Sequence, residues 1–308
     1  MASPAWWRLE LDDAGELEES LLWKLPELGI HRVAVQFSPR TPGQRQLLAW
    51  LPEIDWPEEQ RSELERALAP LAEPFGTSLP PLRWQRQPDE DWNLSWKRHW
   101  QPDPVGQRLL ILPAWLEPPA EHSGRLLIRM DPGSAFGTGS HPTTRLCLEA
   151  LEEAAAQRGG SLAGLQVADL GCGSGVLGLA ALQLGASAVA AVDTDSLAVR
   201  ATAANAALNG LETGVTVVHG SADRLADLLA GRPADLLLCN ILAPVIEVLA
   251  PTFTALLAPG GRGWLSGLLT DQAPALQAVL ADLGWQSALV ATQERWGLMT
   301  LDRAGDVP

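Results

Sequence analysis

The residues that most clearly indicate chemistry form a glycine-rich stretch, Asp169-Leu-Gly-Cys-Gly-Ser-Gly175. It includes the end of an apolar run that begins at Val167, and a helical pattern follows from Val176, so it predicts a strand-to-helix turn. Glycines at Gly171 and Gly173 permit a sharp turn and let a ligand approach the backbone at the start of a helix. The stretch therefore predicts a cofactor site that includes both glycines.

Two classes of cofactor use such a turn. Gly173-Ser-Gly-Val-Leu-Gly178 satisfies the dinucleotide pattern G-x-G-x-x-G, and Asp193 lies 20 residues beyond Gly173. A dinucleotide would place its pyrophosphate on the turn, where the carboxylate of Asp169 would repel it. S-adenosylmethionine instead carries a sulfonium and an ammonium group, which Asp169 attracts. Asp169 therefore favours S-adenosylmethionine over a nicotinamide cofactor, although an N-cap or turn role for this carboxylate is an alternative.

Polar residues follow the next strands of the predicted sheet. Asp193 is placed to accept hydrogen bonds from ribose hydroxyls with either cofactor, whereas Asp195 is better explained as a cap for the helix from Ser196. Ser221 follows the third strand, where an adenine edge or a plain loop would fit. Asn240 ends the fourth strand, beside the crevice where ligands bind in such sheets, or it is a turn amide. These residues complete a candidate site at one edge of a sheet.

A second glycine-rich segment lies upstream, Asp131-Pro-Gly-Ser-Ala-Phe-Gly-Thr-Gly-Ser-His-Pro-Thr-Thr144. It leads into an amphipathic helix that we expect to begin near Thr143 or Thr144. Phe136, Gly137 and Thr144 join the candidate cofactor contacts, although a Thr at this place also caps a helix. His141 has no second ligand at a metal-like spacing, so we expect a structural histidine and no metal site.

The elements that must position these residues alternate between strands and helices from about residue 105 onward. This order predicts an α/β fold with a parallel, doubly wound sheet of the Rossmann-like kind. The predicted strands are 167–170, 188–192, 215–218, 235–239, 263–265 and two within 285–302. The predicted helices are 176–184, 196–208, 243–257 and 272–283.

The first part of the chain has a different pattern. Residues 1–87 contain the order βαββαβ, with strands at 7–11, 32–37, 46–51 and 82–86 and helices at 16–28 and 57–71. This order predicts a small α+β domain of the ferredoxin-like type. Residues 88–104 are polar and rich in tryptophan, which predicts a connector. The cofactor-binding domain is then expected at residues 105–308.

Composition limits the class of protein. The 308 residues include 46% hydrophobic and 19% charged residues, which is typical of a folded globular protein. The net charge of −15 disfavours a broad nucleic-acid interface, yet it suits a basic protein partner. We expect no secretory signal, no membrane span and a cytoplasmic protein. Three scattered cysteines, Cys147, Cys172 and Cys239, predict buried apolar side chains and no disulfide framework.

Taken together, the motifs resemble the PrmA family, whose members methylate large-subunit ribosomal protein eleven. The resemblance rests on Asp131 to Thr144, Asp169 to Gly175, Val192-Asp-Thr-Asp195 and Asn240-Ile-Leu242, with Asp91 to Lys97 similar to the connector of that family. The run Phe-Gly-Thr-Gly-Ser-His-Pro-Thr-Thr is the most specific of these. The longer segment 152–164 departs from the pattern, and we expect it to form an extended surface loop.

The resemblance implies a class I methyltransferase sheet and a small N-terminal domain that recognises the substrate. It also implies that Thr144, Gly171, Asp193 and Asn240 contact S-adenosylmethionine. The family modifies lysine ε-amines and an N-terminal α-amine. From the residues alone, we expect Asn240 to orient the incoming amine, since no residue identifies itself as a base. A methyltransferase for another protein or a small molecule, and a cofactor-binding scaffold without activity, are the alternatives.

Overall fold

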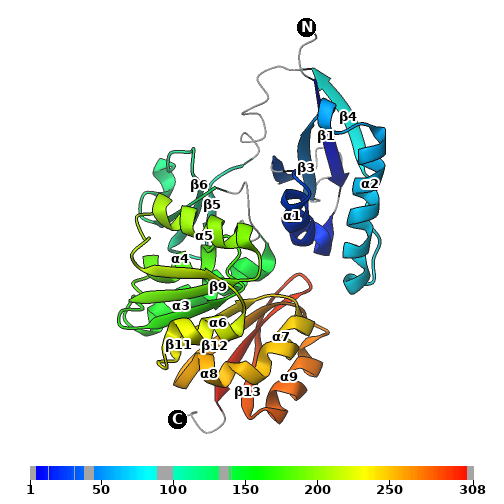
Figure 1. Ribbon diagram of the computed structural model, residues 1–308. Helices are drawn as coiled ribbons and strands as arrows, with labels where there is room; N and C mark the ends of the chain where they lie inside the picture. The colour runs from blue at the N-terminus through cyan, green and yellow to red at the C-terminus, as the bar shows by residue number, and fades with distance from the viewer. Residues whose placement is uncertain are drawn as a thin grey trace. The chain divides into compact units, whose positions relative to one another are not determined.

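The N-terminal unit of the chain extends to Gln101. Apolar and polar residues alternate along its first strand, so one side of the strand faces a hydrophobic core. In this computed structural model the described residues are 5–12, 14–30, 32–37, 45–88, 100–131, 139 and 141–303. Leu9 and Leu11 are fully buried and form one core with the two helices. The elements of this unit (Figure 1) are β1 Ala5–Asp12, α1 Glu18–Glu27, β2 Val33–Phe37, β3 Arg45–Pro52, α2 Glu58–Leu68 and β4 Arg83–Pro88.

The four strands form a sheet in the order β2-β3-β1-β4, and every pair of neighbours is antiparallel. Each helix connects two parallel strands that are separated by a third strand, which is the split βαβ arrangement of a ferredoxin-like fold. The predicted ferredoxin-like topology is therefore confirmed. The tryptophan-rich connector with Trp92 and Trp96 lies outside the described residues.

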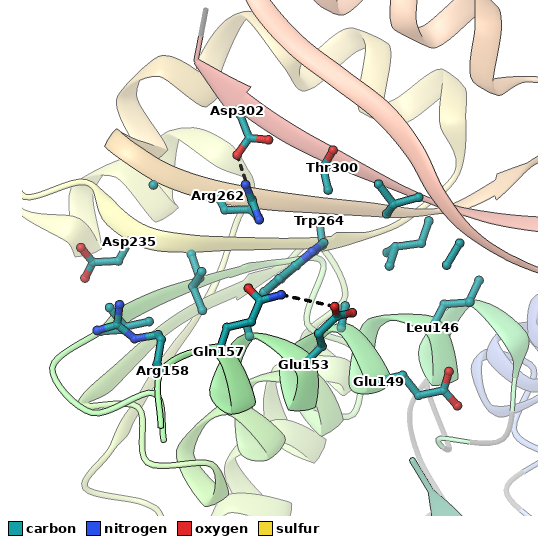
Figure 2. Close-up of a pocket in the computed structure, with 18 of the residues that line it drawn as sticks. Leu146, Glu149, Glu153, Gln157, Arg158, Asp235, Arg262, Trp264, Thr300 and Asp302 are labelled. Carbon is teal, nitrogen blue, oxygen red and sulfur yellow. Dashed lines mark hydrogen bonds and ion pairs between the residues drawn. The ribbon is translucent and has the colours of Figure 1, made fainter. Parts of the chain in front are cut away.

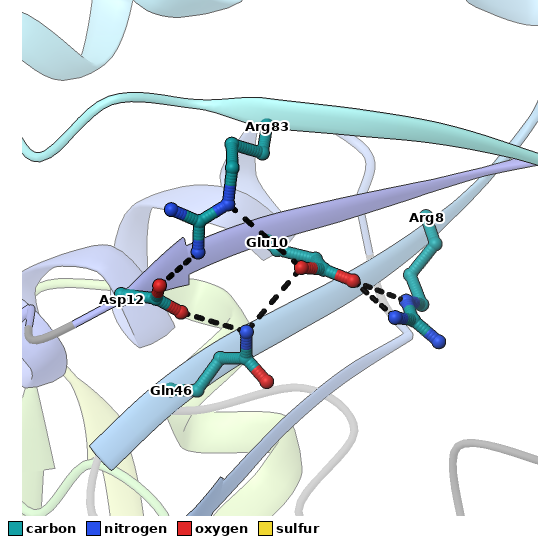
Figure 3. A network of polar contacts seen from close by, with 5 residues as sticks. All are labelled: Arg8, Glu10, Asp12, Gln46 and Arg83. Carbon is teal, nitrogen blue, oxygen red and sulfur yellow. Dashed lines mark hydrogen bonds and ion pairs between the residues drawn. The ribbon is translucent and has the colours of Figure 1, made fainter. Parts of the chain in front are cut away.

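The other residues of β1 place charges on the opposite side of this sheet. Glu10 is only 2% exposed, and its carboxylate contacts the guanidinium groups of Arg8 and Arg83 (Figure 3). Gln46 donates from Nε2 to Asp12 Oδ1 at 2.7 Å and to Glu10 Oε2 at 3.4 Å. A buried carboxylate is tolerated because cationic and amide donors surround it. This network joins three strands of the sheet.

The second unit begins at Pro102 and contains the predicted cofactor motifs. It opens with a small sheet of β5 Asp103–Val105, β6 Leu109–Pro113 and β7 Leu126–Met130. The main sheet and its helices are α3 Pro142–Gln157, β8 Gln166–Leu170, α4 Val176–Gln183, β9 Ala188–Asp193, α5 Ser196–Leu208, β10 Val215–His219, α6 Ala222–Leu229, β11 Ala234–Asn240, α7 Ala243–Leu249, α8 Phe253–Leu256, β12 Leu257–Leu269, α9 Ala273–Asp282, β13 Trp285–Gln293 and β14 Trp296–Arg303.

The seven strands follow the order β10-β9-β8-β11-β12-β14-β13. The strands from β10 to β12 run parallel, and β14 is antiparallel to both of its neighbours. From β8 the chain moves outward to β9 and β10, and then returns to the other side of β8 with β11. The order therefore reverses between β8 and β11, and ligands bind at such a switch point, outside the carboxyl ends of the strands.

Alternate residues of the main sheet contribute to two hydrophobic cores. Val167 and Leu238 pack with α3 and α4, whereas Ala168 and Leu237 pack with α6, α7 and α9 on the other face. Both faces of the central strands are covered, which explains why the predicted strands read as continuous apolar runs. The Rossmann-like, doubly wound prediction is confirmed.

Several predicted boundaries were wrong for identifiable reasons. The helix expected over 243–257 breaks into α7, a 3₁₀ turn and α8, because Pro251 cannot donate a backbone hydrogen bond. The short helix α6 was not predicted. The extended loop expected over 152–164 is helical as far as Gln157. Glu152 is 8% exposed and accepts from the backbone N–H groups of residues 107, 108 and 109, so it anchors the start of β6.

Candidate functional site

The glycine-rich turn joins β8 to α4 at the switch point of the sheet. Gly171, Gly173 and Gly175 all have positive φ, at 78°, 55° and 84°. The N–H groups of Gly171 and Cys172 both donate to the carbonyl of Val192, at 2.9 and 3.0 Å, which ties the turn to the end of β9. A Cβ atom at Gly171 would lie 2.5 Å from Ile241 Cγ2. The backbone here thus requires glycine both for its conformation and for its packing.

Asp193 ends β9 directly beside this turn. Its Oδ2 accepts from the N–H of Gly173 at 2.9 Å, and its Oδ1 accepts from the N–H of Asp195 at 2.9 Å. Burial raises the pKa of this carboxyl, and its backbone hydrogen bonds oppose that effect. A carboxylate has about four lone-pair sites, so acceptor capacity remains for a ligand hydroxyl. Asp195 caps α5 as expected, because its side chain accepts from Leu197 N–H at 2.8 Å.

Asp169 lies in β8 below the turn and is 1% exposed. Its Oδ2 accepts from the N–H of Gly178, in the first turn of α4, at 3.1 Å. Burial raises the pKa of Asp169 to about 7, the hydrogen bond from Gly178 lowers it, and the charge of Asp193 raises it further. The carboxylate is therefore not an open surface contact. Near neutral pH, this carboxyl beneath the turn is present in both its charged and its protonated form.

Asn240 ends β11 on the other side of the switch point. Its Nδ2 donates to Thr144 Oγ1 at 3.3 Å, so two residues that are 96 positions apart in the sequence lie together. Both side chains are buried, at 8% and 1% exposure. The carbonyl oxygen Oδ1 of Asn240 has no hydrogen-bond partner in the part of the chain that the structure describes. An unsatisfied buried acceptor costs about 1–3 kcal/mol, which a bound N–H donor would recover.

The helix α3 carries Thr144 in its first turn. It begins at Pro142, one or two residues earlier than expected, and its cap is His141 instead of a threonine. His141 Nδ1 lies 2.8 Å from Thr143 Oγ1 and accepts from Thr143 N–H at 3.3 Å. The imidazole packs edge-on against Trp296, with ring centroids 4.7 Å apart. No sequence spacing indicated Trp296, because it comes from the distant hairpin of β13 and β14.

The remaining predicted residues divide into two groups. Ser221 precedes α6 without capping it through its side chain, and the N–H of neighbouring Gly220 donates to the carbonyl of Asp193 at 2.9 Å. Ser221 therefore lies close to the Asp193 end of the site. Phe136 and Gly137 lie outside the described residues.

The described residues contain no group of three or more His, Cys, Asp or Glu side chains that could hold a metal ion. Cys147, Cys172 and Cys239 are all free and buried, as expected. None of the described helices is both long and apolar enough to cross a membrane.

A separate cavity of about 800 Å³ opens between α3 and the sheet, beside the amino-terminal ends of β8 and β11 (Figure 2). Its polar side chains largely bind one another or the backbone. Arg262 Nε lies 2.9 Å from Asp302 Oδ1, and Gln157 Nε2 donates to Glu153 Oε1 at 3.3 Å. Asp235 Oδ2 accepts from the N–H of Gln166 at 2.8 Å. This cavity shares no residue with the site at the switch point.

The site at the switch point can be compared with known proteins. The chain matches the family described as "Ribosomal protein L11 methyltransferase (PrmA)" over residues 5–304. It is 66% identical to a ribosomal protein L11 methyltransferase of Synechococcus sp. (strain RCC307), covering 98% of this chain and 99% of the relative. A relative of the same name from Parasynechococcus marenigrum is 65% identical and covers 94% and 98% of the two chains.

A similar chain is also found among solved structures. It is described as a ribosomal protein L11 methylase from Lactobacillus delbrueckii subsp. bulgaricus, with 32% identity and a TM-score of 0.57. The match covers 66% of this chain and 99% of that structure. Identity along nearly the whole chain, together with the methyltransferase-like sheet, leads to one assignment. This chain belongs to the ribosomal protein L11 methyltransferase (PrmA) family.

Proposed function

We propose that this methyltransferase transfers methyl groups from S-adenosylmethionine to amines of ribosomal protein L11, namely lysine ε-amines and the N-terminal α-amine. The observation that carries this proposal is the buried carbonyl oxygen of Asn240 beside the glycine turn, which has no hydrogen-bond partner among the described residues. A buried acceptor at this place can accept a hydrogen bond from the N–H group of an incoming amine. The names of the relatives supply the identity of the protein substrate.

The residues at the switch point fit S-adenosylmethionine. Gly171 and Gly173 would let the ligand approach the turn, and Asp193 has acceptor sites left for ribose hydroxyls. Asp169 provides a buried carboxyl below the turn, and a bound cation would favour its charged form whereas a pyrophosphate would oppose it. Thr144 and Ser221 complete the set of proposed contacts. Phe136 and Gly137 stay predictions.

When bound, S-adenosylmethionine supplies a methyl group that its sulfonium charge has already activated. The protein then contributes mainly by orienting the two reactants and excluding water, since no acid–base pair is required. Asn240 Oδ1 accepts one N–H of the incoming amine and so directs the nitrogen lone pair. Nδ2 of the same amide donates to Thr144, which holds the side chain in this orientation. Low polarity around these two residues lowers the amine pKa and favours the neutral, nucleophilic form.

The N-terminal unit is our candidate for substrate recognition. The cofactor motifs lie beyond Pro102, whereas β1, β2, β3 and β4 form a sheet with its own core. A tethered recognition unit would raise the effective concentration of each target amine at the site. With a ribosomal protein as substrate, the site of action is the cytoplasm.

Two measurements test this proposal. Purified chain, labelled S-adenosylmethionine and ribosomal protein L11 should give labelled L11, and L11 should be the main labelled band when cell extract is the acceptor. Thermal unfolding should show stabilisation by S-adenosylmethionine or S-adenosylhomocysteine, about 2.7 kcal/mol at a hundredfold excess over the dissociation constant. Stabilisation by NAD alone would overturn the cofactor, and labelling of a different protein or small molecule would overturn the substrate.

A further inference from the structure

A row of exposed apolar side chains begins two residues after Asn240. Leu242, Val245 and Val248 are 42%, 43% and 76% exposed. Eight large apolar residues are exposed in the described part of the chain, and three of them belong to this row. Ala243 and Ile246 of the same helix are buried in the core, so the row covers the outward side of α7. An apolar row beside a candidate active site indicates a contact surface.

Tight packing fixes the start of this row relative to the site. The N–H of Ile241 donates to the carbonyl of Ser266 in β12 at 3.1 Å. A Cβ atom at Gly171 would lie 2.5 Å from Ile241 Cγ2, and one at Gly267 would lie 2.4 Å from the carbonyl oxygen of Ile241. Ile241 is therefore held between the cofactor turn and β12. A segment that binds to the row consequently has a defined position relative to Asn240.

We propose that Leu242, Val245 and Val248 form the docking surface for the segment of the protein substrate that carries the target amine. The inference rests on the proposed function, since the surface continues directly from the residue that would orient the amine. From position 242 to 248 the helix rises about 9 Å, the length of about three residues of an extended strand. The surface is therefore long enough to contact apolar side chains of the substrate that lie within about three residues of the modified amine.

Charge around the row suits the same occupant. The only ionisable residue of α7 is Glu247, and the whole chain carries a net charge of −15. An ammonium group on the approaching segment meets no cation on this helix, and the overall field attracts it. A second copy of this acidic chain would be repelled by the same field. A basic segment with apolar flanking residues is therefore the preferred occupant.

The test compares Val245→Ser/Val248→Ser with Leu208→Ser in the full chain. Leu208 is a matched control because it is 45% exposed at the end of α5 and belongs to no proposed site. We expect KM for ribosomal protein L11 to rise about tenfold in the double variant, with kcat and the affinity for S-adenosylmethionine unchanged. The control should match the wild type. An unchanged KM in an active enzyme would overturn the docking surface alone, whereas a wild type inactive on L11 would overturn the proposed function as well.

A photo-crosslinking amino acid identifies the occupant directly. With Val248→p-benzoylphenylalanine, illumination in the presence of L11 should yield an adduct with the mass of both proteins. The same substitution at Leu208 should give none. A crosslink to residues 1–101 of the same chain, or to a second copy, would show that another surface covers the row and would overturn the proposal.

Discussion

At the carboxyl edge of the seven-stranded sheet, polar groups are buried and incompletely satisfied, whereas at the opposite edge they largely bind one another or the backbone. The first edge holds the glycine turn, a carboxyl with a pKa of about 7 and the oxygen of Asn240, which no described residue satisfies. The second edge holds the open cavity of Figure 2, where Arg262 binds Asp302 and Gln157 binds Glu153.

This difference is the reason why we place the proposed site at the first edge and not in the open cavity. The cavity at the second edge lies in the gap between α3 and the sheet, and most of its polar side chains already have partners. Desolvated carboxyls and a missing hydrogen bond occur at the first edge, where they cost stability unless a ligand compensates them. Five substitutions test whether the two edges differ in this way.

The largest effect should come from Gly171→Ala. The new Cβ meets Ile241 and the residue keeps a positive φ, so we expect roughly 3 kcal/mol or more of destabilisation together with loss of cofactor binding. The matched control is Gly159→Ala, with a φ of 77° and nothing within 4 Å of the added Cβ, which should cost only about 1–2 kcal/mol. Urea unfolding measures both. Equal losses would show that the contact with Ile241 is unimportant.

Asn240→Leu should lower the methylation rate about 100-fold, because the amine loses the acceptor that orients it. Stability should change little, since removal of the oxygen, which has no partner in the described structure, offsets the loss of the hydrogen bond from Nδ2 to Thr144. Asn240→Asp keeps an oxygen in this place and should retain more activity than the leucine variant. Single-turnover rates and thermal unfolding provide the comparison. Equal activity of the two variants would remove the acceptor role.

Asp193→Ala should weaken binding of S-adenosylmethionine by roughly 1.5–3 kcal/mol, the range for hydrogen bonds to a charged group. It also frees the N–H of Gly173, which loosens the turn. Asp195→Ala is the control, because this neighbouring carboxylate only caps α5 and should cost about 1 kcal/mol of stability without affecting the cofactor. Calorimetric titration separates the two. Unchanged affinity in a folded Asp193 variant would place this residue outside the site.

The raised pKa of Asp169 predicts that the free energy of unfolding depends on pH. Its folded pKa of about 7 exceeds the ordinary value of 3.8, so the native state holds a proton that the unfolded chain has already released. The contribution of Asp169 to wild-type stability should therefore fall as pH rises from about 4 to 7. Asp169→Asn removes this penalty, and its gain over wild type should be roughly 2 kcal/mol larger at pH 8 than at pH 5. A gain independent of pH would contradict the raised pKa.

The smallest effect should come from the opposite edge. Arg262→Met breaks a partly exposed ion pair with Asp302, and such pairs contribute less than about 1 kcal/mol. Methylation rate and cofactor affinity should match the wild type. A large loss of activity in this variant would mean that the cavity of Figure 2 takes part in the reaction, and the contrast between the two edges would fail.

Local sequence was sufficient to predict the turn, the cap and most of the elements around the site. The helix at 196–208 has the predicted bounds, and Asp195 caps it, because capping depends on residues two or three positions apart. The glycines of the turn were predicted because their allowed backbone angles depend only on the residue itself. The short helix α6 was missed, since a helix of eight residues depends on packing more than on propensity.

Long-range pairing was decided only by the tertiary structure. Asn240 and Thr144 lie together because β11 ends at the switch point where α3 begins, and nothing local to either residue indicates this contact. The same holds for Trp296 against His141 and for Glu152 beneath the start of β6. The sequence by itself determined the glycine turn between β8 and α4, through steric limits within a few residues. Which buried oxygen has no partner among the described residues depends on strand order and burial, and these arise only when distant segments pack.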